Sequence, residues 1–131
     1  MNIGMVAART GVPAKTIRYY ESVGLIHSAT RKANGYRAYD EIDVEVLRFI
    51  QRARGLGFSV EDVASLLALW RDKRRTSANV KSLALKHLER VEHKIRELES
   101  IRKAIRDLVR RCRGDDRPEC PILDQLADEP R

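Results

Sequence analysis

The chain has 131 residues and a formal net charge of +7, with 26 Lys and Arg against 19 Asp and Glu. This length suits one compact domain, or a small domain with an appendage. No uncharged stretch approaches the roughly 18 residues of a membrane-spanning helix, and two cysteines cannot support a disulfide-rich scaffold. We therefore expect a cytoplasmic protein with reduced thiols and no membrane partner.

The positive charge is concentrated in the first third of the chain. Residues 1–39 carry six basic side chains and one acid, residues 40–80 carry seven of each sign, and residues 81–131 carry 13 basic and 11 acidic side chains. A basic end on an otherwise balanced protein favours contact with the phosphates of nucleic acid. A merely soluble basic surface is the alternative.

Two short helices are predicted near the N-terminus. The first runs from Ile3 to about Thr10 and ends at Gly11. The second runs from Pro13 to about Ser22, because the missing N–H of a proline would be unpaired at the first helical position anyway. Ile17 and Tyr20 share its core face. Two short helices joined by a tight glycine turn predict a helix-turn-helix.

The next segment has the pattern of a β-hairpin. Asn34-Gly35 is the strongest two-residue hairpin signal, and basic and aromatic residues flank it between Arg31 and Tyr39. We predict a wing here, and an ordinary surface loop is the alternative.

Two further helices are predicted before residue 71. Asp40 can cap a helix over Glu41–Arg54, and Ser59 can cap another after the break at residues 55–57. The side chains expected to face the core are Ile42, Val46, Leu47 and Ile50 in the first, and Val60, Val63, Leu66, Leu67 and Trp70 in the second.

One long helix is predicted from about Ala78 to Arg111, after a polar, basic linker. Apolar residues recur every seven positions at Ala84, Val91, Leu98 and Ile105, with Leu88, Ile95, Ile101 and Leu108 beside them. The helix would be about 50 Å long, too long to bury this stripe against the small N-terminal domain. We predict a coiled-coil homodimer, with folding back onto its own chain as the alternative.

The two cysteines, Cys112 and Cys120, follow this helix, and the turn-rich segment between them can bring their sulfurs together. They could be ordinary buried thiols, a reversible disulfide or metal ligands. Structural zinc usually takes four ligands, whereas two thiolates and little else suit a soft ion of low coordination such as Cu(I).

The assembled motifs resemble the MerR family of transcription regulators over nearly the whole chain. They are Thr16-Ile17-Arg18-Tyr19-Tyr20-Glu21 followed by Gly24-Leu25-Ile26, Asn34-Gly35-Tyr36-Arg37 with Tyr39, and Gly57-Phe58 with Asp62. The stretch Cys112-x-Gly114-Asp115-Asp116-x-x-x-Cys120-Pro121-Ile122 resembles the copper-responsive branch, the copper-efflux regulators, which also answer silver and gold.

The resemblance implies a mainly α fold in four parts. These are a winged helix-turn-helix DNA-binding domain (residues 1–70), a linker (71–79), a dimerisation helix forming an antiparallel coiled coil between protomers (80–111), and a metal-binding loop with a tail (112–131).

The resemblance also implies one Cu(I) per protomer, or Ag(I) or Au(I), held by Cys112 and Cys120. Relatives that answer divalent ions usually carry a cysteine where this chain has Ser77. Without that thiolate, two thiolates and a +1 ion carry a net charge of −1. Arg113 is a departure, because close copper relatives often have proline there, and its cation could offset this charge or loosen the loop.

For DNA, the resemblance implies a homodimer on a palindromic promoter. Lys15, Thr16 and Arg18 would meet the major groove, while Tyr19, Arg31, Tyr36 and Arg37 would grip the backbone. Arg54 would touch phosphate or remain solvated, and Tyr20 and Tyr39 would pack in the core. Metal binding would bend and untwist an over-long promoter spacer, activating copper, silver or gold efflux or detoxification genes through RNA polymerase on that DNA.

Two rival functions remain open from the sequence. The first is a thiol redox regulator with the same DNA-binding body and a Cys112–Cys120 disulfide as the signal. The second, from another class, is a metal carrier or storage protein, which would not bind DNA sequence-specifically. An enzyme is not expected, since the chain has no G-x-G-x-x-G, P-loop or H-E-x-x-H motif.

Overall fold

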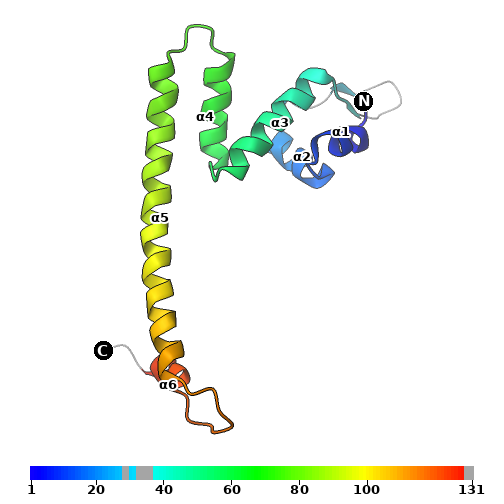
Figure 1. Ribbon diagram of the computed structural model, residues 1–131. Coiled ribbons are helices and arrows are strands. Elements are labelled where there is room, and N and C mark those ends of the chain that lie inside the picture. The colour runs from blue at the N-terminus through cyan, green and yellow to red at the C-terminus, as the bar shows by residue number, and fades with distance from the viewer. Residues whose placement is uncertain (28–29, 32–36, 129–131) are drawn as a thin grey trace. The chain divides into compact units, whose positions relative to one another are not determined.

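The structure, a computed structural model, describes residues 1–27, 30–31 and 37–128 (Figure 1). Two compact units make up the chain, Met1–Leu83 and Ala84–Arg131. The predicted mainly helical fold is confirmed, and none of the described helices is long and apolar enough to cross a membrane. The elements are α1 (Ile3–Thr10), α2 (Ala14–Ser22), β1 (Thr30–Arg31), β2 (Arg37–Ala38), α3 (Glu41–Gly55), α4 (Val60–Arg71), α5 (Ser77–Arg111) and α6 (Pro121–Ala127).

The turn between α1 and α2 depends on Gly11, as predicted. Gly11 has φ +76°, in the left-handed region, and its N–H donates to the Ala7 carbonyl, which ends α1. The Thr10 hydroxyl donates to the Val6 carbonyl at 2.8 Å and accepts the Val12 N–H at 3.2 Å, so the turn leaves no buried polar group of Thr10 unpaired.

The predicted start of α2 was wrong by one residue. Pro13 precedes the helix rather than opening it, because its ψ of 145° is extended. Its carbonyl nevertheless accepts the Ile17 N–H at 3.0 Å, which is the first hydrogen bond of the helix.

Both predicted caps of the next two helices are confirmed. The Asp40 carboxylate accepts the Asp43 N–H at 3.0 Å, and the Asp43 carboxylate accepts the Asp40 N–H at 2.9 Å, forming a capping box at α3. Ser59 accepts the Asp62 N–H at 3.1 Å at α4. α3 ends at Gly55, one residue beyond the predicted Arg54.

The prediction that Ile42 faces the core was wrong. Ile42 is 67% exposed, whereas Val44, Leu47 and Ile50 are at most 1% exposed. Residues two apart on an α-helix point about 200° apart, so the stripe that buries Val44 in the first turn turns Ile42 to solvent.

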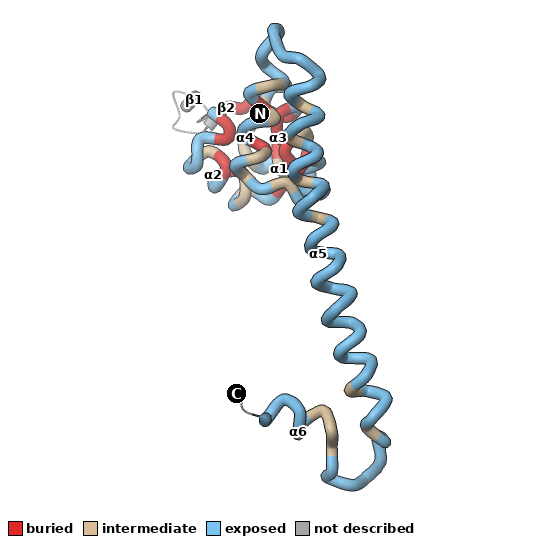
Figure 2. The backbone as a smooth tube through the Cα atoms, turned by 90° about the vertical axis from the view of Figure 1, so that its left-hand side faces the viewer, coloured by how far each residue is buried: buried red, intermediate tan, exposed pale blue. Residues whose placement is uncertain are grey.

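The hydrophobic core lies entirely in the first unit, among α1–α4 and the segments that join them (Figure 2). Trp70, which was expected in the core stripe of α4, is instead 43% exposed, with its ring stacked on Phe49 at 4.6 Å. The buried apolar residues are Val6, Val12, Ile17, Tyr20, Leu25, Ile26, Tyr39, Val44, Val46, Leu47, Ile50, Ala53, Val63 and Leu67, so the core packing predicted for Tyr20 and Tyr39 is confirmed.

α5 has no buried residue along its 35-residue length. It begins at Ser77, one residue before the predicted start, where the Thr76 hydroxyl accepts the Asn79 N–H at 3.2 Å. The apolar side chains of the predicted stripe are about half exposed, for example Ile95 at 47% and Leu98 at 57%. The exposure of this face is unusual, because an apolar stripe of this width on a helix normally packs against another element.

The Gly11 turn can be tested by substitution. A Cβ at residue 11 would meet the Gln51 side-chain nitrogen at 3.2 Å and would adopt a φ that L side chains rarely take. We expect Gly11→Ala to lower the free energy of unfolding by roughly 1–3 kcal/mol, measured by urea denaturation at fixed protomer concentration. Gly55→Ala is the matched control, since a Cβ there meets nothing within 4 Å and its φ is ordinary. Equal effects of the two substitutions would contradict the role given to Gly11.

Candidate nucleic-acid interface and thiol pair

The open face of α2 carries the residues predicted to meet DNA. The helix is anchored by Ile17, which is fully buried, while Lys15, Arg18 and Tyr19 are exposed and Thr16 is half-buried. Residues three and four positions apart lie on the same side of a helix, so the three exposed side chains form one surface. Two cations and a phenol on an exposed helix have the chemistry to reach phosphates and base edges in a major groove.

The predicted wing is present as a short antiparallel strand pair. β1 pairs with β2, and Arg31 stands opposite Arg37 in the register. Residues 32–36, which include Tyr36 and the Asn34-Gly35 turn, lie outside the described residues. The pairing of the wing strands is therefore confirmed, whereas the DNA contacts of Arg31, Tyr36 and Arg37 stay predictions.

The end of the wing is bonded to two other parts of the first unit. Tyr39 follows β2 and is 4% exposed, and its hydroxyl donates to the Glu21 carboxylate in the last turn of α2. The Tyr39 N–H donates to the Met1 carbonyl at 2.7 Å, and the Met1 amino group donates to the Tyr39 carbonyl at 2.9 Å. Wing and α2 are thus joined directly by a side-chain hydrogen bond.

Arg54 has a structural partner at the turn between α3 and α4. Its Nη1 donates to the Phe58 carbonyl at 2.7 Å, which closes the chain over Gly55–Gly57. The residue is exposed, so a phosphate contact stays a prediction beside this bond.

The two cysteines lie close together, as predicted. The sulfur atoms of Cys112 and Cys120 are 3.9 Å apart, and both residues are half-buried free thiols. The loop that joins them turns at Gly114, which has φ +66°, and at Asp115, whose carboxylate accepts the Arg117 N–H at 3.0 Å. In the described part of the chain no group of three or more His, Cys, Asp or Glu residues could hold a metal ion.

Helix α6 was not predicted from the sequence, and Cys120 stands at its N-cap. Pro121 occupies the first turn, a signal for a helix start that the sequence does contain. The backbone N–H groups of Leu123 and then Ile122 point at the Cys120 sulfur and lower the pKa of that thiol. The Cys120 thiol therefore loses its proton more readily than a free thiol.

A cavity of about 280 Å³ is lined by residues of the loop between the two cysteines, and neither cysteine is among the residues that line it. Its lining includes the sequence neighbours of both cysteines, Arg111 and Arg113 beside Cys112 and Glu119 and Pro121 beside Cys120. Arg113 lines this cavity, and its effect on the thiol pair stays a prediction.

Ser77, the other residue predicted for the metal site, is the first residue of α5. Cys112 follows the last residue of the same helix. At 1.5 Å per residue, about 50 Å of helix separates them, so Ser77 cannot approach the thiols of its own chain.

Family models identify the chain over both halves of its length. The model described as MerR HTH family regulatory protein matches residues 1–69, and the model described as MerR, DNA binding matches residues 44–108. The chain belongs to the MerR family of transcription regulators.

Relatives of this MerR-family chain are similar along its whole length. It is 54% identical over 128 residues to the HTH-type transcriptional regulator HmrR of Rhizobium leguminosarum bv. viciae, and the aligned residues cover 98% of each of the two chains. It is 51% identical over 128 residues to the heavy metal-dependent transcription regulator 1 of Rhizobium meliloti (strain 1021), covering 97% of this chain and 87% of that protein. These similarities identify the MerR-family chain as a regulator and not an enzyme.

The solved structures agree with the fold. The transcription regulator PbrR691 from Ralstonia metallidurans CH34, in complex with lead(II), matches with a TM-score of 0.82 and 31% identity, covering 97% of this chain and 99% of that one. The predicted helix-turn-helix followed by a long helix is therefore the fold of a MerR-family protein.

The α2 surface can be tested with a charge-removing substitution. We expect Arg18→Gln to weaken binding to a mixed-sequence DNA duplex and to reduce the slope of log affinity against log salt by about 1, because one phosphate contact is lost. Fluorescence anisotropy at several salt concentrations measures both quantities. Lys86→Gln removes the same charge from α5, outside the predicted DNA-binding domain, and an equal loss in that variant would contradict the assignment.

The lowered pKa of Cys120 predicts that this thiol ionises at a lower pH in the folded protein than in the unfolded chain. Because the thiolate is the form that reacts, alkylation of Cys120 by iodoacetamide should reach half its maximal rate at a lower pH in the folded protein than in urea. Cleavage after Glu119 separates the two cysteines for mass spectrometry. Identical folded and unfolded midpoints would show that the N–H groups of α6 do not act on the sulfur.

Proposed function

We propose that the protein is a metal-responsive regulator that binds a palindromic promoter as a homodimer and activates copper, silver or gold efflux or detoxification genes when it binds Cu(I). The observation that carries the proposal is the pair of sulfurs 3.9 Å apart. In this proposal residues 1–70 bind DNA, residues 71–79 form a linker, residues 80–111 pair with a second copy, and residues 112–131 sense the ion.

The donor set fits a single soft ion. Bonds from a metal to thiolate sulfur are about 2.3 Å long for zinc, so two sulfurs must lie within about 4.6 Å to share one ion. The sulfurs of Cys112 and Cys120 meet this limit without rearrangement. When bound, the ion would link the two thiolates and so fix the loop between them.

The charge of the site favours an ion of +1. Two thiolates and Cu(I) sum to −1, which is the charge that three thiolates give with a divalent ion, and Arg113, next to Cys112 in the sequence, offers a cation to the negative complex. Ser77 stands where a third thiolate would be needed for a divalent ion. Ag(I) and Au(I) share the charge and the preference for sulfur, so we expect one such ion per protomer.

The apolar stripe of α5 supports an antiparallel homodimer. Six of its eight members form pairs symmetric about the midpoint between Lys94 and Ile95, namely Ala84 with Ile105, Leu88 with Ile101, and Val91 with Leu98, whereas Ile95 and Leu108 fall opposite Lys94 and Lys81. Two copies running in opposite directions would therefore place these three kinds of apolar pair opposite one another, each of them twice. Ser77 and Cys112 are symmetric about the same midpoint, so the partner's Ser77 would face the thiol pair.

The DNA-binding end would act on the shape of the promoter. Each protomer would place α2 in a major groove, with Lys15, Thr16 and Arg18 at the bases and Tyr19 with the wing at the backbone. Bending DNA costs on the order of 1–6 kcal/mol, which a dimer can supply if one of its two states holds the DNA more strongly bent. RNA polymerase would respond through the DNA when the promoter elements become aligned.

A second candidate function rests on the same distance. A disulfide needs sulfurs at about 2.05 Å, so closing the loop by under 2 Å would allow a two-electron oxidant such as hydrogen peroxide, which is reduced to water with the two thiol protons, to join the sulfurs. Oxidation of Cys112 and Cys120 would then be the signal in place of a metal. A carrier or storage role has no such support, because the chain belongs to a family of transcription regulators.

A titration under anaerobic conditions separates these functions. Reduced protein is titrated with Cu(I) against a competing chelator, and we expect one tight equivalent per protomer that is lost in Cys112→Ser. Lys15→Gln is the control, because it alters the α2 surface and should keep the ion site intact. If no tight binding occurs and hydrogen peroxide yields a Cys112–Cys120 disulfide that changes transcription, the redox function replaces the metal function.

A further inference from the structure

The strands of the wing are too short to orient the wing by themselves. β1 and β2 contain two residues each, and their register pairs Thr30 with Ala38 and Arg31 with Arg37. An isolated pair of strands is at best marginally stable in water. The direction of the wing relative to α2 must therefore be set by contacts outside the strand pair.

Tyr39, the residue that follows β2, provides such a contact. Its side chain is 4% exposed and belongs to the hydrophobic core of the first unit, and its hydroxyl donates to the Glu21 carboxylate at 2.5 Å. Its N–H donates to the Met1 carbonyl at 2.7 Å, and the next residue, Asp40, caps α3. Tyr39 is thus held through both its side chain and its backbone, so β2 ends at a fixed point.

Glu21 lies where a carboxylate is otherwise unfavourable. It is the one acidic residue among residues 1–39, and it lies in the last turn of α2, where the negative end of the helix dipole disfavours an acid. It is three residues beyond Arg18, so it lies close to the surface predicted to meet phosphates, which a carboxylate repels. The hydrogen bond from Tyr39 offsets part of both effects, because the charged carboxylate accepts it.

A loosely held wing would change the two parts of DNA binding to different degrees. The attraction between cations and phosphates is independent of sequence and acts over about 10 Å, so it survives a pivot of the wing. Phosphate contacts also fix the register of a protein on the duplex, and base edges are read at hydrogen-bond distance only in that register. Loss of a fixed wing should therefore reduce discrimination between sequences more than the affinity for any DNA.

We infer that Glu21 is a positioning residue for sequence recognition. Through the Tyr39 hydroxyl it holds the wing at a set distance from α2, so that the phosphates gripped by the wing place the bases under the exposed side chains of α2. Neither Glu21 nor Tyr39 needs to touch the DNA in this role. The inference rests on the DNA contacts that the proposed function gives to α2 and the wing.

The test compares binding to two kinds of DNA. The full chain, in reducing buffer, first selects a tightly bound duplex from a random-sequence pool. Fluorescence anisotropy then gives the affinity for this duplex and for a mixed-sequence duplex, and the ratio of the two affinities is the specificity ratio. We expect Tyr39→Phe to lower this ratio about tenfold, the effect of losing a hydrogen bond to a charged group. Its affinity for the mixed-sequence duplex and the salt slope should stay within about twofold, because no charge is removed.

A double-mutant cycle shows whether the two residues act through each other. Glu21→Ala removes the acceptor and should lower the specificity ratio as much as Tyr39→Phe does. The variant with both substitutions should lose no more than either single variant. Glu21→Gln keeps an acceptor oxygen for the Tyr39 hydroxyl and should retain most of the ratio.

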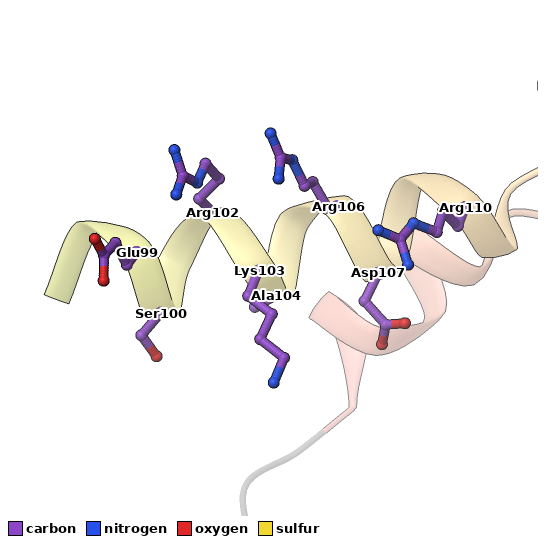
Figure 3. Close-up of a pocket in the computed structure, with 8 residues that line it drawn as sticks. All are labelled: Glu99, Ser100, Arg102, Lys103, Ala104, Arg106, Asp107 and Arg110. Atoms are coloured by element: carbon purple, nitrogen blue, oxygen red, sulfur yellow. The ribbon is translucent and has the colours of Figure 1, made fainter. Parts of the chain in front are cut away.

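Two control variants match these changes at other positions. Tyr20→Phe removes the hydroxyl of another buried tyrosine, which has no hydrogen-bond partner in the described part of the chain, and should leave the specificity ratio unchanged. Glu99→Ala removes a carboxylate that Figure 3 shows projecting from α5, in the second unit, and controls for the change in net charge. Urea denaturation verifies that each variant is folded under the assay conditions.

The possible results separate this inference from the proposed function. If folded Tyr39→Phe keeps the specificity ratio of the parent and only its free energy of unfolding falls, the bond is structural and the positioning role is wrong. Additive losses in the double variant would also contradict the role, because the two residues would then act independently. If the parent selects no duplex from the pool, the sequence-specific DNA binding of the proposed function fails, and the inference fails with it.

Discussion

The apolar face of α5 is the constraint on which the proposed dimer and its sensing site depend. The helix has no buried residue, yet it carries a continuous stripe of Leu, Ile and Val that is about half exposed. Full burial of one such side chain stabilises a protein by about 1.5–3 kcal/mol. In a single protomer the stripe stays partly in water, so much of this stabilisation is not realised. The core of α1–α4 is complete without α5, which leaves the stripe free to serve association.

The proposed role of the thiol pair depends on the association of two copies through this face. A protomer alone offers two sulfurs at the end of a helix and a short helix that directs two N–H groups at one of them. The beginning of the same helix carries Ser77, about 50 Å of helix away. Only a second copy running in the opposite direction can bring the two ends together. The proposed sensing site is thus a property of the pair, and its donor set depends on how the helices align.

Much of the fold could be predicted because local signals and long-range packing agree in the first unit. Gly11, Asp40 and Ser59 mark helix ends by chemistry that needs no tertiary context, and all three do so in the structure. Ile42 and Trp70 were misplaced because periodicity shows which face is apolar but not where the core ends. Helix α6 was missed because seven residues are too few for a clear pattern, despite the proline at its start.

The candidate site was predictable to a lesser degree. The spacing of Cys112 and Cys120 indicated that the sulfurs could meet, but the orientation of the Leu123 and Ile122 N–H groups toward Cys120 requires α6 and could not be foreseen. For Arg54 the sequence shows a cation after a helix, and only the folded turn reveals its bond to the Phe58 carbonyl. The exposure of the α2 residues predicted to meet DNA was the easiest to foresee, because burial of Ile17 turns Lys15, Arg18 and Tyr19 outward.

The hydrogen bond between Tyr39 and Glu21 has a mechanical consequence for a regulator of this kind. It ties the end of the wing to the last turn of α2, so the two elements that would touch DNA on either side of a groove keep a fixed spacing. This bond restrains the distance between the end of the wing and α2 within one protomer. In the proposed dimer, we therefore expect a response to change the spacing and tilt between the two protomers, and the duplex held by both to deform with them.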